Sequence, residues 1–517
     1  MVWKRLRAAG ASVLVAGLLA GCAGDGGTGG QAADGPLKVV GPFEVHSIDP
    51  ATSGGFFTRL QVAETLVEAS TDGALQPGLA TGWETSEDRL TWRFTIRPDA
   101  LFHDGTAVTA EAVKAALETA RSKESPLADV PVKAVTADGG TVTVELTKPF
   151  APLAAVLAHT STQILAPASY GPDRAVTEVI GSGPYRVERL QQPSGIELTA
   201  FEQWQGEKPV IREVTYQAVG RAESRALMAE SGQADVTFGM DPVSLQRLQQ
   251  NEGVEIEAVT LPRSILLKAN AGHEILGDLH VRQALSTALD RKSMAEALLR
   301  DPEMAATQLF PPSLQDWHQE SLDPLAHDAE AAKALLAEAG WTPGADGVLV
   351  RDGRRFEVSL RTFPDRPELP VLATAVQAAL REVGIVVDVR IGNSSEIPAA
   401  HQDGTLELAL FTRNFALVPD PLVTLAGDFA PEGSDWGAMG WNNPELTAAL
   451  NDLARGADGQ AAEDGRETAA RILHTELPVI PVAWYRQSAI VNDRVEGLEL
   501  DPLERSWRIS ELSWAQK

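Results

Sequence analysis

The sequence of 517 residues predicts a mixed α/β fold, because alternating strands and amphipathic helices occur along the same chain. Residues 90–96 alternate between apolar and polar side chains, as a half-buried strand does. Thr109 precedes a helical stretch from Ala110 to Arg121 and is a residue type that favours the N-cap. A second helix over 371–383 ends at a glycine and is followed by the β-branched strand 385–391. Such a succession of helix, glycine and strand is an α/β step.

The remaining elements follow from the same patterns. Residues 141–146 alternate as a strand and follow a turn formed by Asp138-Gly139-Gly140. Apolar residues recur at helical spacing over 281–299, and Asp290-Arg291 within this stretch is interpreted as a helix-end ion pair or cap. A further helix over 329–339 is closed by Gly340. No repeat period occurs in the chain.

The first residues predict an export signal. Three basic residues precede an uncharged run over 8–20, which is too short for a stable bilayer-spanning helix and suits a signal-peptide core. Leu19-Ala20-Gly21-Cys22 resembles the bacterial lipobox, in which the cysteine is acylated after cleavage. We therefore expect a signal peptide over 1–21, lipidation of Cys22 and a glycine-rich flexible tether over 22–36. The alternative is an ordinary secretory peptide in which the cysteine has no role.

Composition narrows the classes of function. Cys22 is the only cysteine, so no disulfide and no cysteine nucleophile are expected in the body. The formal net charge of −27 argues against nucleic acid as a partner, because phosphate binding needs a basic face. The body is too long for a single core and should form two or three domains. No later segment is apolar enough to span a membrane, so a soluble body is expected.

Five motifs in the body resemble one known family in the expected order. Residues 73–113 read GALQPGLATGWETSEDRLTWRFTIRPDALFHDGTAVTAEAV and resemble the signature region of the peptide/nickel/opine-binding solute-binding proteins of ABC importers, extracellular solute-binding family 5. The other four matches are Gly181–Tyr185, His280–Leu285 with Asp290-Arg291, Ala331–Trp341 and Val418–Pro421. The resemblance covers roughly residues 37 to 515.

The resemblance implies a two-lobed periplasmic-binding-protein fold, type II-like and of the large class with an extra subdomain, with the ligand cleft between the lobes. The implied borders are 37–55, 178–265 and 480–517 for the core of the first lobe, 56–177 for the extra subdomain, and 266–479 for the second lobe. The hinge would lie near 262–269 and 479–483. Closure of such a cleft buries the ligand by a hinge motion.

The resemblance also proposes ligand contacts. In the family's peptide binders an aspartate near the late Asp-Pro segment pairs with the peptide's amino group, and Asp420 matches that position; the equal alternative is that Asp420 only begins a turn or helix. Arg505 and Arg413 are candidate partners for a ligand carboxylate. Further candidates are the aromatic residues of segments that approach the cleft in the family: Phe56, Phe57, Phe415, Trp436, Trp441 and Trp507. Core packing explains each of them equally well.

In detail the pattern is more similar to the family's nickel-chelate binders, with two departures. The stretch 159–163, which includes the candidate Thr160, lacks the arginine that clamps the chelator. The loop 431–436 lacks the histidine that binds the metal. His159 could supply an imidazole ligand instead, although a lone histidine more often makes an ordinary hydrogen bond.

These observations favour an extracytoplasmic lipoprotein that binds short peptides or peptide-like solutes for an ABC permease and its ATPase. It would be a monomer without a cofactor, anchored to the membrane through Cys22. A nickel or other metal–chelator complex is the alternative ligand, and peptide sensing without transport is the alternative role. A hydrolase is disfavoured, because the chain has no G-x-S-x-G elbow and no metalloprotease helix. His103-Asp104-Gly105 is interpreted as a turn rather than a catalytic pair.

Overall fold

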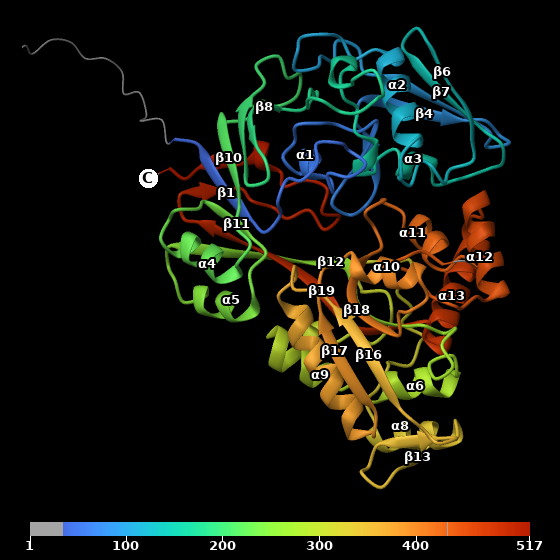
Figure 1. Cartoon of the computed structure of the whole chain (residues 1–517). Coiled ribbons are helices and arrows are strands. Elements are labelled where there is room, and N and C mark those ends of the chain that lie inside the picture. The colour runs from blue at the N-terminus through green and yellow to red at the C-terminus, as the bar shows by residue number, and fades with distance from the viewer. Residues whose placement is uncertain (1–34, 432, 517) are drawn as a thin grey trace, which may run out of the picture. The chain divides into compact units, whose positions relative to one another are not determined.

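The computed structural model describes residues 35–431 and 433–516, so Cys22 and the predicted signal peptide lie outside the described residues. From Pro36 onward the chain forms one compact unit. Its largest element is a ten-stranded mixed sheet with the strand order β17-β16-β18-β12-β19-β11-β1-β10-β9-β8 (Figure 1). In that order the strands are β17 Val386–Ile391, β16 Glu357–Thr362, β18 Leu408–Asn414, β12 Val254–Ala269, β19 Val479–Asn492, β11 Val236–Phe238, β1 Leu37–Gly41, β10 Glu213–Ala218, β9 Gly195–Ala200 and β8 Tyr185–Gln191.

Two long antiparallel strands, β12 and β19, connect the two halves of this sheet. The end of β12 near Val254 and the end of β19 near Asn492 pair beside β11, whereas the other ends pair beside β18. The register between the two strands shifts between Thr260 and Ser264. We call the part that contains β1 and β8–β11 the first lobe, and the part that contains β16–β18 the second lobe. The domain borders given above stay predictions.

Each lobe has its own hydrophobic core. In the first lobe, aromatic side chains cover one face of the sheet, where Trp507 stacks on Phe238 at 4.8 Å and on Tyr216 at 5.3 Å between ring centroids. Helices α4 (Ala222–Glu230) and α5 (Pro242–Leu248) pack on the other face. The core of the second lobe is larger and gathers apolar residues from β16, β18 and the helices around them.

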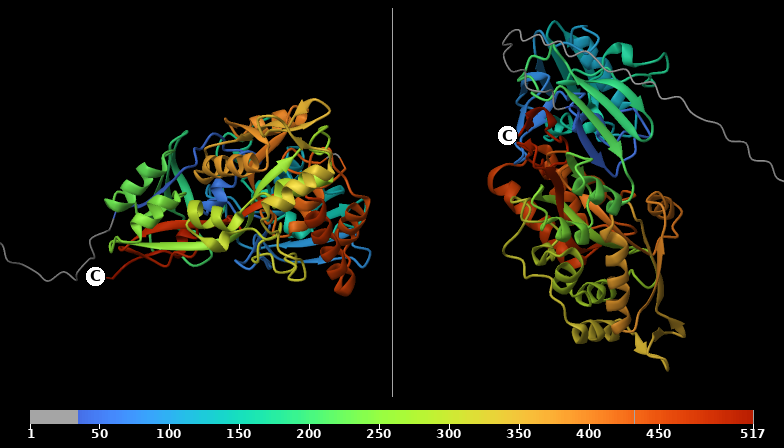
Figure 2. Two further views of the ribbon diagram at one scale, coloured as in Figure 1. Left: turned by 90° about the horizontal axis from the view of Figure 1, so that it is seen from below. Right: turned by 90° about the vertical axis from the view of Figure 1, so that its left-hand side faces the viewer.

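A four-stranded sheet and helix α2 form a subdomain of the first lobe with a separate core (Figures 1 and 2). Its strands are β4 Ala80–Thr85, β5 Thr91–Ile96, β7 Thr141–Leu146 and β6 Val132–Asp138. The segment Gly181–Tyr185 ties the subdomain to the sheet. A side chain at Gly181 or Gly183 would collide with the backbone carbonyls of Val62 and Gln61, which explains why two glycines stand there.

The remaining helices and small sheets surround these cores. The helices are α1 Phe56–Arg59, α2 Ala110–Arg121, α3 Leu153–Val156, α6 Leu279–Thr287, α7 Arg291–Met294, α8 Ala329–Glu338, α9 Glu368–Glu382, α10 Glu396–Gln402, α11 Pro421–Asp428, α12 Pro444–Arg455 and α13 Gly459–Glu476. Single turns are η1 Thr160–Thr162, η2 Pro167–Ser169, η3 Ala295–Leu299, η4 Pro302–Met304 and η5 Ile509–Glu511. The short strands pair as β2 Val67–Ala69 with β3 Leu75–Pro77, β13 Thr342–Pro343 with β14 Leu349–Arg351 and β15 Arg354–Arg355, and β20 Val495–Glu496 with β21 Ser513–Trp514.

The structure confirms most predicted elements. Helix α2 has the predicted bounds, and the Thr109 hydroxyl accepts a hydrogen bond from the amide of Ala112 at 3.2 Å. Strand β7 also has the predicted bounds, and β5 and β17 begin one residue later than predicted. Gly340 follows α8 with a φ of +84°, the left-handed conformation that favours glycine.

The stretch 281–299, in which apolar residues recur at helical spacing, is divided among three helical segments. The chain forms α6, α7 and the π-helical turn η3 in this region. The break occurs at Asp290, whose carboxylate accepts hydrogen bonds from the amide and hydroxyl of Ser293 and caps a new helix. Asp290 is therefore a helix cap, as the sequence indicated.

Candidate functional site

A cavity of about 490 Å³ lies beside the strands β12 and β19 and takes its walls from both lobes. The first lobe contributes Met240 and the side of α5, and the second lobe contributes residues 299–301, Met304 and Glu368. Trp484 and Tyr485 of β19 form the wall between them. Small-molecule sites commonly lie in cavities that take their walls from two domains.

Glu368 brings an unsatisfied carboxylate oxygen to this cavity. Its Oε1 atom is enclosed and has no hydrogen-bond partner among the described residues. Burial raises the pKa of Glu368 above its usual range, against the attraction of Arg366 and a hydrogen bond to Tyr485. Because a buried acceptor without a partner costs free energy, this oxygen is suited to a donor supplied by a ligand.

Arg300 brings a cation to the same cavity. Arg300 directly follows the turn η3 and adopts the left-handed backbone conformation, with a φ of +60°. Its side chain is exposed and makes no ion pair within residues 35–431 and 433–516. The neighbouring Arg486 differs, because it is paired with Asp301. One free carboxylate oxygen and one free guanidinium therefore line a single cavity.

Positive charge dominates the wall beyond Tyr485. The guanidinium groups of Arg263 and Arg366 lie 5.4 and 5.0 Å from the centroid of the Tyr485 ring, and Arg366 donates to the Tyr485 hydroxyl at 2.9 Å. Arg263 pairs with Glu504, which also accepts a hydrogen bond from Asn414 at 2.8 Å. Burial acts to raise the pKa of Glu504, but attraction to Arg263, Arg366 and Arg59 outweighs it and lowers the pKa to about 2.

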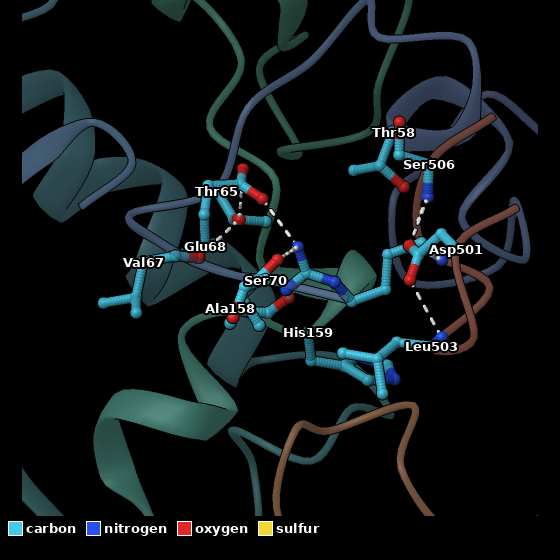
Figure 3. A network of polar contacts seen from close by, with 12 residues as sticks. Thr58, Thr65, Val67, Glu68, Ser70, Ala158, His159, Asp501, Leu503 and Ser506 are labelled. Atoms are coloured by element: carbon cyan, nitrogen blue, oxygen red, sulfur yellow. Dashed lines mark hydrogen bonds and ion pairs between the residues drawn. The ribbon is translucent and has the colours of Figure 1, made fainter. Parts of the chain in front are cut away.

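A second, smaller cavity of about 230 Å³ lies entirely within the first lobe. Arg505 lines it and is only 6 % exposed. Its guanidinium donates to Glu68 at 2.7 Å and to the carbonyl of Ala158 at 3.5 Å, whereas its Nε atom has no partner among the described residues. Figure 3 shows this network, with Glu68 and Ala158 on one side and Asp501, which accepts backbone hydrogen bonds, on the other.

The other walls of this cavity are polar. They include the hydroxyl residues Thr58, Thr160 and Ser506 together with Glu64. Burial raises the pKa of Glu64 to about 7, although Arg97 binds both of its oxygens at 3.0 Å. Two of the predicted ligand residues, Arg505 and Thr160, thus share one cavity.

His159 lies next to this cavity but is used by its own backbone. Its Nδ1 atom caps η1 by accepting a hydrogen bond from the amide of Ser161 at 3.1 Å, and it lies 2.8 Å from the Ser161 hydroxyl. Burial and the nearby Arg505 and Arg413 lower the pKa of His159 to about 4. In the described parts of the chain, no three His, Cys, Asp or Glu side chains are grouped as a metal site would require.

Arg413 faces the first lobe from the end of β18. It binds both oxygens of the buried Asp428 at 2.7 Å, and Asp428 also accepts a hydrogen bond from the Ser434 hydroxyl. This ion pair orders the start of the loop after α11. Arg413 lies near His159, since its charge contributes to the lowered pKa of that side chain.

The other predicted ligand residues lie elsewhere. Phe56 and Phe57 are buried in the core of the first lobe, and Phe415 is buried against Phe310 in the core of the second lobe. The half-buried Trp436 packs against Phe411 at 5.4 Å between centroids, and Trp441 and Trp507 are core residues. None of them lines either of the two cavities described above.

Asp420 forms the N-cap of α11. Its carboxylate accepts a hydrogen bond from the amide of Leu422 at 3.0 Å. This agrees with the alternative expectation that Asp420 begins a helix. Burial raises its pKa to about 6. A cap uses one carboxylate oxygen, so the role of Asp420 as an amine partner stays a prediction.

The sequence did not predict Glu368, Arg366, Tyr485 and Arg300 as site residues. The predicted helix began at residue 371, whereas α9 begins at Glu368 and contains Pro370 in its first turn, where proline is tolerated. Tyr485 and Arg300 belong to no motif, and they come together only in the folded chain, where both line this cavity. His103 is structural as predicted, since its Nε2 atom lies 3.0 Å from the carbonyl of Gly183.

Comparison with known proteins identifies the family. Residues 74–435 match the family model "Bacterial extracellular solute-binding proteins, family 5 Middle". The chain belongs to this family. Its resemblance to the peptide/nickel/opine-binding proteins is thereby confirmed. Members of this family bind solutes outside the cytoplasm for ABC importers. Proteins similar to this chain include nickel-, dipeptide- and glutathione-binding proteins.

Two curated relatives cover nearly the whole family 5 chain. The nickel-binding periplasmic protein of Escherichia coli K12 is 26% identical over 481 residues, which cover 90% of this chain and 91% of the relative. The dipeptide-binding protein of the same organism is 24% identical over 464 residues and covers 83% and 84%.

Solved structures confirm the two-lobed periplasmic-binding-protein fold. NikA from Brucella suis in complex with Fe(III)-EDTA superposes with a TM-score of 0.84 at 24% identity, covering 93% of this chain and all of that one. The oligopeptide-binding protein AppA from Bacillus subtilis, in complex with a nonapeptide, gives 0.79 at 21% identity, covering 93% and 99%. Within the described residues, none of the helices of this chain combines the length and apolar character that crossing a membrane requires.

Proposed function

We propose that this family 5 protein captures short peptides or peptide-like solutes in the 490 Å³ cavity between its lobes and delivers them to an ABC permease without catalysing a reaction. One observation carries the proposal: the cavity is lined by a carboxylate oxygen of Glu368 and a guanidinium of Arg300 that have no partner among the residues the structure describes. A short peptide carries an ammonium at one end and a carboxylate at the other, which matches these two groups in charge.

The physical chemistry of Glu368 supports an amine as its partner. Burial holds its pKa above the usual range, because it destabilises the charged form of the carboxyl group. An ammonium group at Oε1 would restore the charged form and make a charge-assisted hydrogen bond, about twice as strong as a neutral one. Arg300 can take the carboxylate through two parallel hydrogen bonds.

Closure of the lobes is the step that would bury such a solute. The cavity takes walls from both lobes, so a hinge motion at β12 and β19 opens or closes it. We further propose that Cys22 carries a lipid that holds the protein, as a monomer, at the extracytoplasmic face of the membrane. The lipobox-like Leu19–Cys22 segment supports this anchor.

A thermal-shift experiment tests the proposed ligand class. Protein from residue 23 onward would be heated with di- to pentapeptides, with nickel–histidine and with sugars. A ligand at 100 times its Kd adds about 2.7 kcal/mol to the free energy of unfolding, enough to raise the midpoint by a few degrees. A shift with peptides is expected. A shift only with nickel–histidine would instead support the metal-chelate alternative.

Two variants test which residue of the cavity binds which end of the peptide. Glu368→Gln should weaken peptide binding by about 10- to 100-fold, the loss of one charged hydrogen bond. Glu382→Gln, an exposed change at the far end of the same helix, is the matched control and should bind as wild type does. Arg300→Asn keeps a residue that tolerates positive φ and should weaken binding of peptides with a free C-terminus more than of their amides. Equal affinity of wild type and both site variants would exclude this cavity as the peptide site.

A further inference from the structure

The subdomain of the first lobe also touches the second lobe at a place away from the strands β12 and β19. Figure 1 shows α12 beneath the subdomain at the right-hand edge, whereas β12 and β19 lie near the centre. Here the guanidinium of Arg89 donates to the carbonyl oxygens of Arg455, at 3.2 Å, and Gly456. A backbone hydrogen bond of 2.8 Å from Ala151 to the carbonyl of Ala454 lies beside it.

Arg89 occupies the carboxyl end of α12. The last carbonyls of a helix have no partner within the helix, and the helix dipole makes this end negative. A guanidinium from the opposite lobe supplies both the missing donors and the positive charge. The exposed Asp458 carboxylate, 3.8 Å from the same guanidinium, adds a weak contact.

Gly456 makes room for this contact. It ends α12 with a φ of +95°, and a Cβ atom built there would collide with the Arg89 guanidinium. Arg89 itself has a φ of +56° in the turn between β4 and β5, so its backbone is also held in a conformation that few non-glycine residues adopt. Two unusual backbone positions, one in each lobe, thus meet at one contact.

Apolar residues of the second lobe reinforce the contact. Val418 belongs to the hydrophobic core of the subdomain, and Val423 of α11 packs against that core. Both precede α12 in the chain. The lobes therefore meet through side chains of the subdomain core as well as through Arg89.

We propose that Arg89 is a latch that holds the lobes closed by capping α12 from the opposite lobe. Rotation of the lobes about β12 and β19 would separate Arg89 from Arg455 and Gly456, so the latch exists only in the closed form. It therefore shifts the closing equilibrium without touching the ligand. The apparent affinity for a ligand falls in proportion when the closed, binding-competent state is less populated. The latch therefore also sets ligand affinity and release, a consequence that rests on the proposed function.

The latch can be tested without a ligand. Spin labels at Glu87→Cys and Gln460→Cys, both exposed and on opposite sides of the contact, report the separation of the lobes in protein from residue 23 onward, which contains no other cysteine. Arg89→Asn removes the guanidinium but tolerates positive φ. We expect this variant to populate longer label distances than the unmutated protein. Arg93→Ala, which removes another exposed arginine of the same sheet, on β5, is the control and should not change these distances.

A second variant approaches the latch from α12. Gly456→Ala places a Cβ where the guanidinium lies and should lengthen the distances as Arg89→Asn does, while circular dichroism reports whether each variant is folded. If a peptide binds in the thermal-shift panel, Arg89→Asn should raise its Kd about 3- to 10-fold, the range of one partly exposed charged contact. The latch proposal would be overturned if the distance distributions were unchanged in both folded variants, or if Arg93→Ala changed them equally. Either result would count whether or not a peptide binds.

Discussion

Replacement of Glu504 by Gln tests how much a buried ion-pair cluster stabilises the region where β12 and β19 join the two lobes. Glu504 belongs to the first lobe, and its side chain is 7 % exposed while that of its partner Arg263 is 8 % exposed. Asn414 of the second lobe donates to the same carboxylate at 2.8 Å. Glu504→Gln leaves the positive charges of Arg263, Arg366 and Arg59 without their central anion.

The expected loss follows from the pKa of Glu504, which folding lowers from 4.5 to about 2. At about 1.4 kcal/mol for each pH unit, this carboxylate contributes about 3 kcal/mol at neutral pH. The value agrees with the roughly 3–5 kcal/mol measured when one partner of a buried ion pair is removed. Because the folded pKa is the lower one, the contribution is complete above pH 4.5 and is lost as the pH falls toward 2.

Urea unfolding followed by circular dichroism measures this effect. At pH 7 the Glu504→Gln protein should be about 3 kcal/mol less stable than wild type, and the difference should shrink to about 2 kcal/mol at pH 3.5. Glu463→Gln, on the exposed face of α13, is the control and should lose less than about 0.5 kcal/mol. A loss below about 1 kcal/mol at pH 7, or one that does not change with pH, would refute the interpretation of Glu504 as the buried anion of this cluster.

Three other changes test separate parts of the structure. Trp507→Ala should cost about 3–5 kcal/mol in urea unfolding, because the indole stacks on Phe238 in a closed core; a loss below about 1 kcal/mol would contradict that packing. Asp420→Ala should cost about 1 kcal/mol through the lost N-cap of α11, and loss of peptide binding at unchanged stability would instead make Asp420 a ligand partner. The imidazole of His159, with its pKa lowered to about 4, should stay neutral at pH 6 in NMR titrations, and its contribution to stability falls as the pH drops from 6.5 toward 4; a midpoint near 6.5 would show that the side chain is open to water.

Local rules predicted the elements that carry their own signals. Thr109 and the alternation of residues 141–146 define α2 and β7 without help from the rest of the fold. Asp290, expected from the sequence to lie at a helix end, caps α7 and divides the helical stretch over 281–299. Helix α9 begins at Glu368 rather than 371, since proline is tolerated in the first turn of a helix.

The candidate site was less predictable than the fold, because its residues meet only through tertiary structure. Arg505 and Thr160, named from family resemblance, do share a cavity. The aromatic candidates Phe56, Phe57 and Phe415 are core residues, and an aromatic side chain in a sequence does not reveal which side of a strand or helix will be covered. Glu368, which we consider the best candidate for the peptide amine, follows no family motif and is recognised only by its unpaired, enclosed oxygen.

Isothermal titration calorimetry of a tripeptide into the protein from residue 23 onward, at pH 7, tests the central claim most directly. We predict one binding site for each chain, with affinity lowered at least 10-fold in Glu368→Gln and unchanged in Glu382→Gln. Absence of heat with di- to pentapeptides, together with one-to-one binding of nickel–histidine, would contradict the proposal that this family 5 protein captures peptides.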